Sequence, residues 1–139
     1  MSKAIVLSRV SSVGQDLSQQ TDEVLREARK DGYTNRNITI IEDVESAIKL
    51  SEEERHGLNK MKDHINKNPK IECVYIYELS RLSRRQLVLF SIRDFLVERK
   101  IQLICLKPYF RLLEFNGEMS QTGSLMFSLF SSLSESEMM

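Results

Sequence analysis

The sequence lacks the features that place a chain in a membrane, in a disulfide framework or around a zinc ion. No apolar run approaches the length of a membrane span, and the apolar run after Met1-Ser2-Lys3 is too short for a signal peptide. Only two cysteines are present, Cys73 and Cys105, each inside its own apolar run and without histidines at zinc-ligand spacing. We therefore expect reduced core cysteines in separate strands of a cytoplasmic protein.

Machinery for binding nucleotides or divalent metals is also missing. The chain has no phosphate-binding glycine loop of the P-loop type. No cluster of aspartates and glutamates at divalent-metal spacing follows the first or the third apolar run. Any chemistry on phosphate groups is therefore expected to proceed without a metal.

The chain carries no net charge, but its charges are unevenly distributed. It has 20 basic and 20 acidic side chains in all. Residues 55–111 hold 13 basic and 5 acidic ones, whereas residues 1–54 hold 7 and 11, and the last 28 residues have four glutamates and no base. The basic central block fits contact with a polyanion, or else solvated helix faces rich in lysine.

Apolar runs alternate with helical patterns along the chain. This alternation predicts an α/β fold with a mostly parallel four- to five-stranded sheet and helices on both faces. The stretch Pro108–Asn116 is expected to be a loop or a fifth short strand, and a long apolar helix is expected from Gly117. The other expected elements are strands at 3–8, 37–42, 72–79 and 101–106, a loop at 43–50, and helices at 16–30, 51–65 and 85–99. The helix at 51–65 is expected to begin with a capping box formed by Ser51 and Glu54. Its apolar face is expected to hold Leu58, Met61, His64 and Ile65.

Two segments that contain arginine and serine come after predicted strands. Arg9-Val10-Ser11-Ser12 follows the first strand, and Arg81-Leu82-Ser83-Arg84 follows the third strand. Open α/β sheets bind ligands at the carboxyl ends of their strands, so these segments are expected at one edge. Arginine binds phosphate oxygens in pairs, and serine can attack phosphorus to give a phosphoserine intermediate. The pattern therefore favours phosphoryl chemistry.

Five segments together resemble the ordered signature blocks of the serine recombinase catalytic domain, the resolvase/invertase family. The resemblance covers nearly all of the chain. The blocks are Arg9-Val10-Ser11-Ser12 with Gln15 and Gln20, Asp43 with Ser46, Arg55-His56-Gly57-Leu58, Arg81-Leu82-Ser83-Arg84, and Gly117-Glu118-Met119.

This resemblance implies a site-specific recombinase that acts on double-stranded DNA. Ser11 is similar to the nucleophile that forms a 5′-phosphoserine link and releases a 3′-hydroxyl. Because the protein–DNA ester conserves bond energy, neither ATP nor another cofactor is implied. Three arginines are similar to those that bind the scissile phosphate and stabilise its transition state: Arg9, Arg81 and Arg84. Arg55 is similar to a further active-site arginine, Gln15 and Gln20 to the polar residues beside the nucleophile, and Asp43 to an acidic residue at the end of the second strand.

The resemblance also implies an organisation into domains and oligomers. Residues 1–116 would form the catalytic domain and residues 117–139 the start of a long oligomerisation helix. The family assembles homodimers and then synaptic tetramers through that helix. No helix-turn-helix or zinc module follows it, so we expect the DNA-binding domain to lie outside these 139 residues. No membrane partner is expected.

Two positions depart from the family pattern. Ser80 stands where the family usually has an aspartate just before the first arginine of its block. Glu135-Ser136-Glu137 stands where the last helix usually carries an arginine between two glutamates. These departures fit ordinary sequence drift at positions that tolerate substitution. They also fit a degenerate recombinase that is kept only for oligomerisation, but the intact Ser11 and its arginines argue against that second interpretation.

Plainer interpretations remain for individual residues. Arg55 fits a surface charge, Asp43 a cap or ion pair, and Gln15 and Gln20 solvated helix positions. The histidines are expected on the surface or in packing rather than as general bases. A receiver-like regulatory domain has the same layout but needs acidic residues after strands one and three, where this chain has Ser8-Arg9-Val10-Ser11 and Ser80-Arg81.

Overall fold

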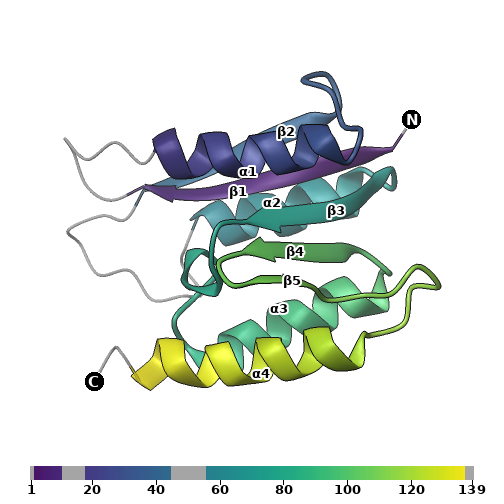
Figure 1. The fold of residues 1–139 in the computed structure, drawn as a ribbon. Coiled ribbons are helices and arrows are strands. Elements are labelled where there is room, and N and C mark those ends of the chain that lie inside the picture. Colours follow the sequence, from purple (N-terminus) through teal and green to yellow (C-terminus); the bar gives the residue numbers. More distant parts are fainter. Residues whose placement is uncertain (1, 11–17, 45–55, 137–139) are drawn as a thin grey trace.

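The computed structural model describes residues 2–10, 18–44 and 56–136, which form one sheet with helices packed around it (Figure 1). The strands of the sheet are central, and every helix runs alongside them. The elements in chain order are β1 (Lys3–Val10), α1 (Ser18–Lys30), β2 (Ile38–Val44), α2 (His56–Lys67), β3 (Ile71–Ile76), the 3₁₀ turn η2 (Leu79–Arg81), α3 (Gln86–Glu98), β4 (Gln102–Leu106), β5 (Tyr109–Arg111) and α4 (Gln121–Ser136).

The five-stranded sheet has the order β2-β1-β3-β4-β5. Its first four strands run parallel, and β5 pairs antiparallel with β4. Only two residues separate β4 from β5, and so short a connection can join only antiparallel strands. The predicted mostly parallel sheet is confirmed, and of the two expectations for residues 108–116 the short strand is right.

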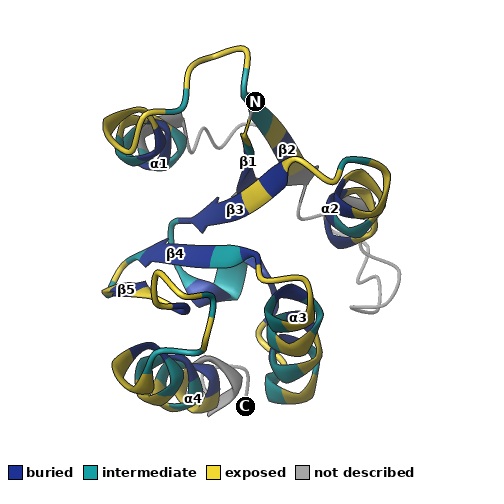
Figure 2. Cartoon of the chain, turned by 90° about the vertical axis from the view of Figure 1, so that its right-hand side faces the viewer, coloured by how far each residue is buried: buried dark blue, intermediate teal, exposed yellow. Residues whose placement is uncertain are grey.

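Helices cover both faces of the sheet, as the sequence predicts (Figure 2). Ala4 and Val6 of β1 pack toward α1, whereas Ile5 and Leu7 belong to the larger cluster with α2 and α3. Successive side chains of a strand point to opposite faces, so a strand buried on both sides needs an unbroken apolar run. This explains why β1 and β3 are almost continuously apolar, and β3 lies in the middle of the sheet.

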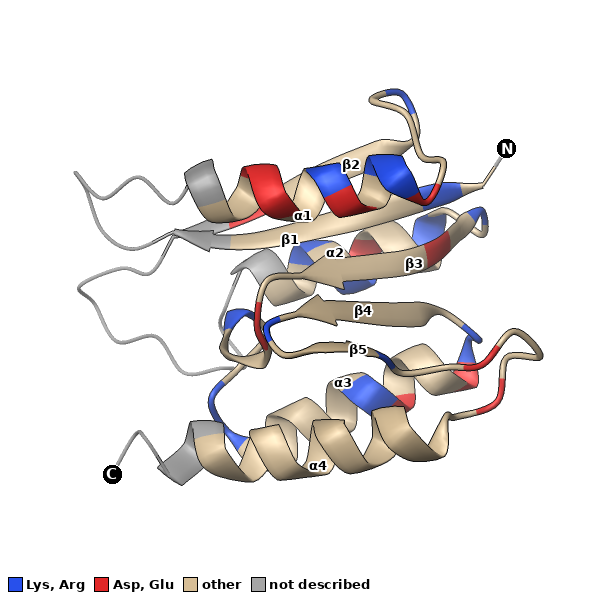
Figure 3. Ribbon diagram, in the orientation of Figure 1, with Lys and Arg blue, Asp and Glu red and all other residues tan. Residues whose placement is uncertain are grey.

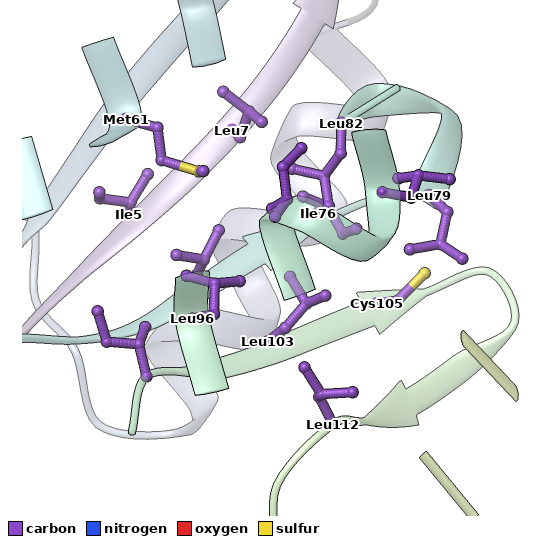
Figure 4. Close-up of a cluster of buried hydrophobic side chains, with 14 of the residues drawn as sticks. Ile5, Leu7, Met61, Ile76, Leu79, Leu82, Leu96, Leu103, Cys105 and Leu112 are labelled. Carbon is purple, nitrogen blue, oxygen red and sulfur yellow. The ribbon is translucent and has the colours of Figure 1, made fainter. Parts of the chain in front are cut away.

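The larger cluster fixes the turn after β3 as well as the helices. Leu79 and Leu82 are both buried in it, three residues apart (Figure 4). A 3₁₀ turn has three residues per turn, which places both leucines on its inner side. Burying a leucine contributes roughly 1.5–3 kcal/mol, so η2 is anchored to the core on either side of Arg81.

The two cysteines are buried and unlinked, as expected. Cys73 lies in the cluster under α1 and Cys105 in the larger cluster, so they face opposite sides of the sheet. Within the described ranges, no three histidine, cysteine, aspartate or glutamate side chains are grouped to hold a metal ion. No helix in the same ranges has the length and apolar character needed to span a bilayer.

Four expectations about element limits or packing are wrong. β2 continues through Val44, so Asp43 lies in a strand and not in a loop. β3 ends at Ile76 because the chain then turns to bury Leu79. α4 begins at Gln121 rather than Gly117, because Gly117 has a φ of 86° and forms a turn, with a hydrogen bond from the Glu114 amide to Glu118 O.

His64 is the fourth correction, since it is exposed while Leu58, Met61 and Ile65 are buried. Its polar ring lies at the border of the apolar face, where water solvates it. The predicted capping box at Ser51 and Glu54 lies outside the described residues.

Candidate active site

The carboxyl ends of β1 and β3 lie side by side because the two strands are neighbours in the sheet. η2 follows β3 after two residues, and α1 begins on the same edge (Figure 1). Residues 20 and 81, far apart in sequence, therefore meet at this edge. Arginines cluster here too, around η2 and the start of α3 (Figure 3).

Arg81 is the best-defined side chain of this edge. Its Nη2 atom donates a hydrogen bond of 3.0 Å to Oε1 of Gln20 in the first turn of α1. The same nitrogen lies 3.1 Å from Oε1 of Glu78, forming an ion pair. Only 15% of the Arg81 side chain is exposed, against 39% for Glu78. The guanidinium is thus held from two sides, by an amide oxygen and by a carboxylate.

Ser80, which occupies the position of the family's usual aspartate, belongs to the same group. Its hydroxyl donates a hydrogen bond of 2.8 Å to Oε1 of Glu78. One carboxylate oxygen therefore contacts both Ser80 and Arg81. Because a carboxylate accepts bonds from charged and neutral donors at once, this arrangement satisfies both side chains.

A hydroxyl pair joins the end of β1 to α1 beside Gln20. Ser8, which is buried, and Thr21, which is partly buried, share a hydrogen bond of 2.7 Å between their oxygens. Together with Tyr77, Gln20 and Arg81, they line a small cavity of about 10 Å³, close to the space that one water molecule fills. Glu78, Ser8 and Thr21 were not singled out from the sequence.

The second arginine of the block differs from the first. Arg84 is exposed, so it faces solvent at the end of the molecule where β1 and β3 terminate. Ser83 is buried, and its Oγ accepts a hydrogen bond of 2.9 Å from the Arg85 amide. Ser83 is therefore committed to shaping the approach to α3, which begins at Gln86.

The remaining predicted site residues are placed only in part. Ser11, Gln15 and Arg55 lie outside the described residues. Arg9 and Asp43 are described by their backbone alone, and the register of β1 and β2 pairs them directly, one residue before each strand ends. Of the predicted set, the structure brings Gln20, Ser80 and Arg81 together.

A larger hollow lies at the opposite edge, where the parallel strands begin. Its volume is about 1080 Å³. Tyr75 donates a hydrogen bond of 2.6 Å to Asp31, and Tyr33 one of 2.6 Å to Glu72. Burial, with these acidic neighbours, raises the pKa of both tyrosines. None of the predicted site residues lines this hollow, so it is separate from the candidate active site.

The fold is that of a serine recombinase catalytic domain. The sequence model of the family described as Resolvase, N terminal domain matches residues 4–138, and the chain belongs to this family. None of the curated proteins compared with the chain is similar enough to count as a match.

Three solved structures share the fold. The N-terminal catalytic domain of TP901-1 integrase is 26% identical with a TM-score of 0.68, and the match covers 97% of this chain and 95% of that one. A resolvase family site-specific recombinase from Streptococcus pneumoniae is 21% identical with a TM-score of 0.62, covering 99% and 88%. The C-terminal catalytic domain of ISC1926 TnpA, an IS607-like serine recombinase, is 20% identical with a TM-score of 0.60, covering 94% and 80%.

Proposed function

We propose that this chain is the catalytic domain of a site-specific recombinase that cuts and rejoins double-stranded DNA through a 5′-phosphoserine intermediate. One observation carries the proposal furthest. Arg81 is held by Gln20 and Glu78 at the edge where β1 ends, and Ser11 is the residue that follows β1 in the sequence. An oriented cation at the edge where this strand ends suits attack by a hydroxyl on a phosphodiester.

The proposed reaction is a transesterification that needs no metal and no ATP. The Ser11 Oγ loses its proton and forms a bond to phosphorus while the bond from phosphorus to the 3′-oxygen breaks, and that oxygen takes up a proton, so that the net transfer is from the serine hydroxyl to the 3′-hydroxyl. Arg9, Arg81, Arg84 and Arg55 neutralise the non-bridging oxygens, whose charge rises in the transition state. Because one phosphate ester replaces another, a 3′-hydroxyl of a second strand can reverse the step and reseal the DNA.

The oligomeric part of the proposal is supported by α4. Leu125, Leu129 and Leu133 are exposed by 68%, 52% and 47%, and they recur every four residues along the helix. Such spacing gives one apolar stripe on the side of the helix opposite to the buried Phe127. A stripe of this kind suits the same helix of a second copy, in a homodimer and then a synaptic tetramer.

The chain would depend on further parts for choosing its target. In this proposal residues 1–116 carry the chemistry, α4 from Gln121 onward is the start of the oligomerisation helix, and sequence-specific DNA recognition lies outside the 139 residues.

The test is a trapping experiment with the full-length protein and a duplex that carries its crossover site. We expect a covalent protein–DNA adduct on a denaturing gel, formed equally well in EDTA and without ATP, and absent in Ser11→Ala. Ser91→Ala, at an exposed position of α3, serves as the matched control and should form the adduct normally. An adduct that survives Ser11→Ala contradicts the assigned nucleophile. Oligomers without any adduct would favour the degenerate recombinase.

A further inference from the structure

We infer that Glu78 is a positioning residue that supplies the carboxylate which Ser80 does not. The inference rests on the proposed function, since it assigns Glu78 the task of holding Arg81 ready for the scissile phosphate. It also explains how an active site of this family keeps its carboxylate when the residue directly before the arginine is a serine.

The geometry of η2 places Glu78 and Arg81 together. Glu78 is the residue that caps η2, with extended backbone angles, and its carbonyl accepts a hydrogen bond of 3.0 Å from the Arg81 amide. The Glu78 carboxylate lies 3.1 Å from Nη2 of Arg81, three residues further on. The pair is therefore joined through backbone and side chain at once.

Two contacts at Nη2 restrain the guanidinium of Arg81. This nitrogen donates a hydrogen bond of 3.0 Å to Oε1 of Gln20 and lies 3.1 Å from Oε1 of Glu78 in an ion pair. With Leu79 and Leu82 buried on either side, the turn itself cannot rotate freely. An arginine held in this way presents its charge without first losing conformational entropy, which is how preorganised sites stabilise a transition state.

Ser80 is the partner that makes Glu78 suitable. Its hydroxyl donates to the same Oε1 atom that contacts Arg81. An aspartate at position 80 would instead bring a second negative charge against Glu78, and like charges at that distance repel. A serine at position 80 with a glutamate at position 78 thus places one carboxylate beside Arg81. An aspartate at position 80 without Glu78 would be a second way to place one carboxylate there.

The experiment compares four forms of the full-length protein: wild type, Glu78→Gln, Ser80→Asp and the double variant Glu78→Gln/Ser80→Asp. Single-turnover cleavage is measured at saturating crossover-site DNA, alongside the dissociation constant for that DNA and the urea midpoint. Glu98→Gln is the matched control, because Glu98 also pairs with an arginine, Arg99, at 3.9 Å, but at the far end of α3.

We expect Glu78→Gln, which keeps the shape of the side chain but removes the charge that pairs with Arg81, to slow cleavage about 10- to 100-fold, with DNA affinity and urea midpoint unchanged. The double variant should regain most of the wild-type rate, because the new carboxylate lies beside Arg81. Ser80→Asp alone should give no gain. Glu98→Gln should cleave like wild type.

Three results would overturn the inference. The first is a cleavage rate of Glu78→Gln that equals or exceeds the wild-type rate, and the second is a double variant that cleaves as slowly as Glu78→Gln. The third is a tenfold faster cleavage by Ser80→Asp, which would show that Arg81 lacks an effective carboxylate partner in the wild-type protein. The comparison of Ser80→Asp with wild type remains informative even if Glu78→Gln does not fold. If wild type itself forms no Ser11-dependent adduct, the proposed function fails, whereas a normal adduct with an unaffected Glu78→Gln variant defeats the positioning role alone.

Discussion

Oε1 of Gln20 accepts a hydrogen bond of 3.0 Å from Nη2 of Arg81, a residue 61 positions further along the chain. The contact joins the first turn of α1 to η2 across the carboxyl ends of β1 and β3. Neither partner is a core residue, so packing alone does not bring them together. Their hydrogen bond ties the helix that follows the Ser11 segment to the arginine proposed to bind phosphate.

Removing the Gln20 amide should therefore loosen Arg81. We expect Gln20→Leu to lower the single-turnover cleavage rate about 10-fold, as for the loss of one hydrogen bond to a charged group. The urea midpoint should hardly change, because Gln20 is only partly buried. Asn66→Leu, which removes an exposed amide near the end of α2, is the control and should cleave normally. An unchanged rate in Gln20→Leu would return Gln20 to the solvated position that its sequence context also allows.

The Ser8–Thr21 hydrogen bond makes a separate prediction about stability. Thr21→Val keeps the shape of the side chain but leaves the Ser8 hydroxyl, which is buried, without this partner. The free energy of unfolding should fall by about 1–2 kcal/mol, since an unsatisfied buried polar group bears its full desolvation cost. Ser8→Ala/Thr21→Val should lose less than the sum of the single variants. Additive losses in urea titrations would show that the two hydroxyls do not depend on one another.

Much of the fold could be predicted because its strands are buried on both sides. Unbroken apolar runs in β1, β3 and β4 and helical periodicity between them are sufficient to indicate the parallel sheet. The end of β3 could not be predicted in this way. Leu79 and Leu82 continue the apolar pattern, and only their burial in the core under a 3₁₀ turn decides that the strand has ended.

Some residues of the candidate site could be predicted from the sequence and others could not. Arg81, Gln20 and Ser80 could be identified through the family blocks, whereas Glu78 could have been found only from its spacing of three residues before an arginine. Ser8 and Thr21 left no signal, because hydroxyls 13 residues apart meet only when β1 and α1 pack. Contacts that depend on tertiary packing are thus the part that the sequence leaves open.

Gly123 lies where α4 packs closely against the backbone of Arg111 and Leu112. A Cβ atom built at this position would lie 2.1 Å from the carbonyl oxygen of Arg111 and 3.0 Å from Cα of Leu112. Both are backbone atoms, which cannot move aside as a side chain would. The Gly123 amide also donates to the Ser120 hydroxyl at 3.1 Å, the pattern of a helix N-cap.

We therefore expect Gly123→Ala to destabilise the domain by about 1–3 kcal/mol, the usual cost of overpacking, despite the higher helix propensity of alanine. Ser132→Ala on the exposed side of α4 should leave the urea midpoint unchanged. Since α4 also carries the exposed leucine stripe, displacing its first turn should weaken self-association in sedimentation measurements. A more stable Gly123→Ala variant would mean that α4 and β5 are not in close contact.

The two buried cysteines predict how stability depends on alkaline pH. Burial raises the pKa of the Cys73 and Cys105 thiols from 9.0 to about 12. Below pH 9 both thiols are protonated in the folded and unfolded chains, so their contribution to stability is fully present. Between about pH 9 and 12 the unfolded chain releases these protons and the folded one keeps them, so the free energy of unfolding falls.

This loss should appear as a lower urea midpoint at pH 10 than at pH 8. Tyr33 and Tyr75, with raised pKa values, titrate in the same sense, so Cys73→Val/Cys105→Val should reduce the fall without abolishing it. At pH 8 the native thiols should react with iodoacetamide on the order of 1,000-fold more slowly than in urea, because only the thiolate reacts. Rapid labelling of the native protein would mean that the thiols are not held protonated in the core, and the alkaline loss would then need another cause.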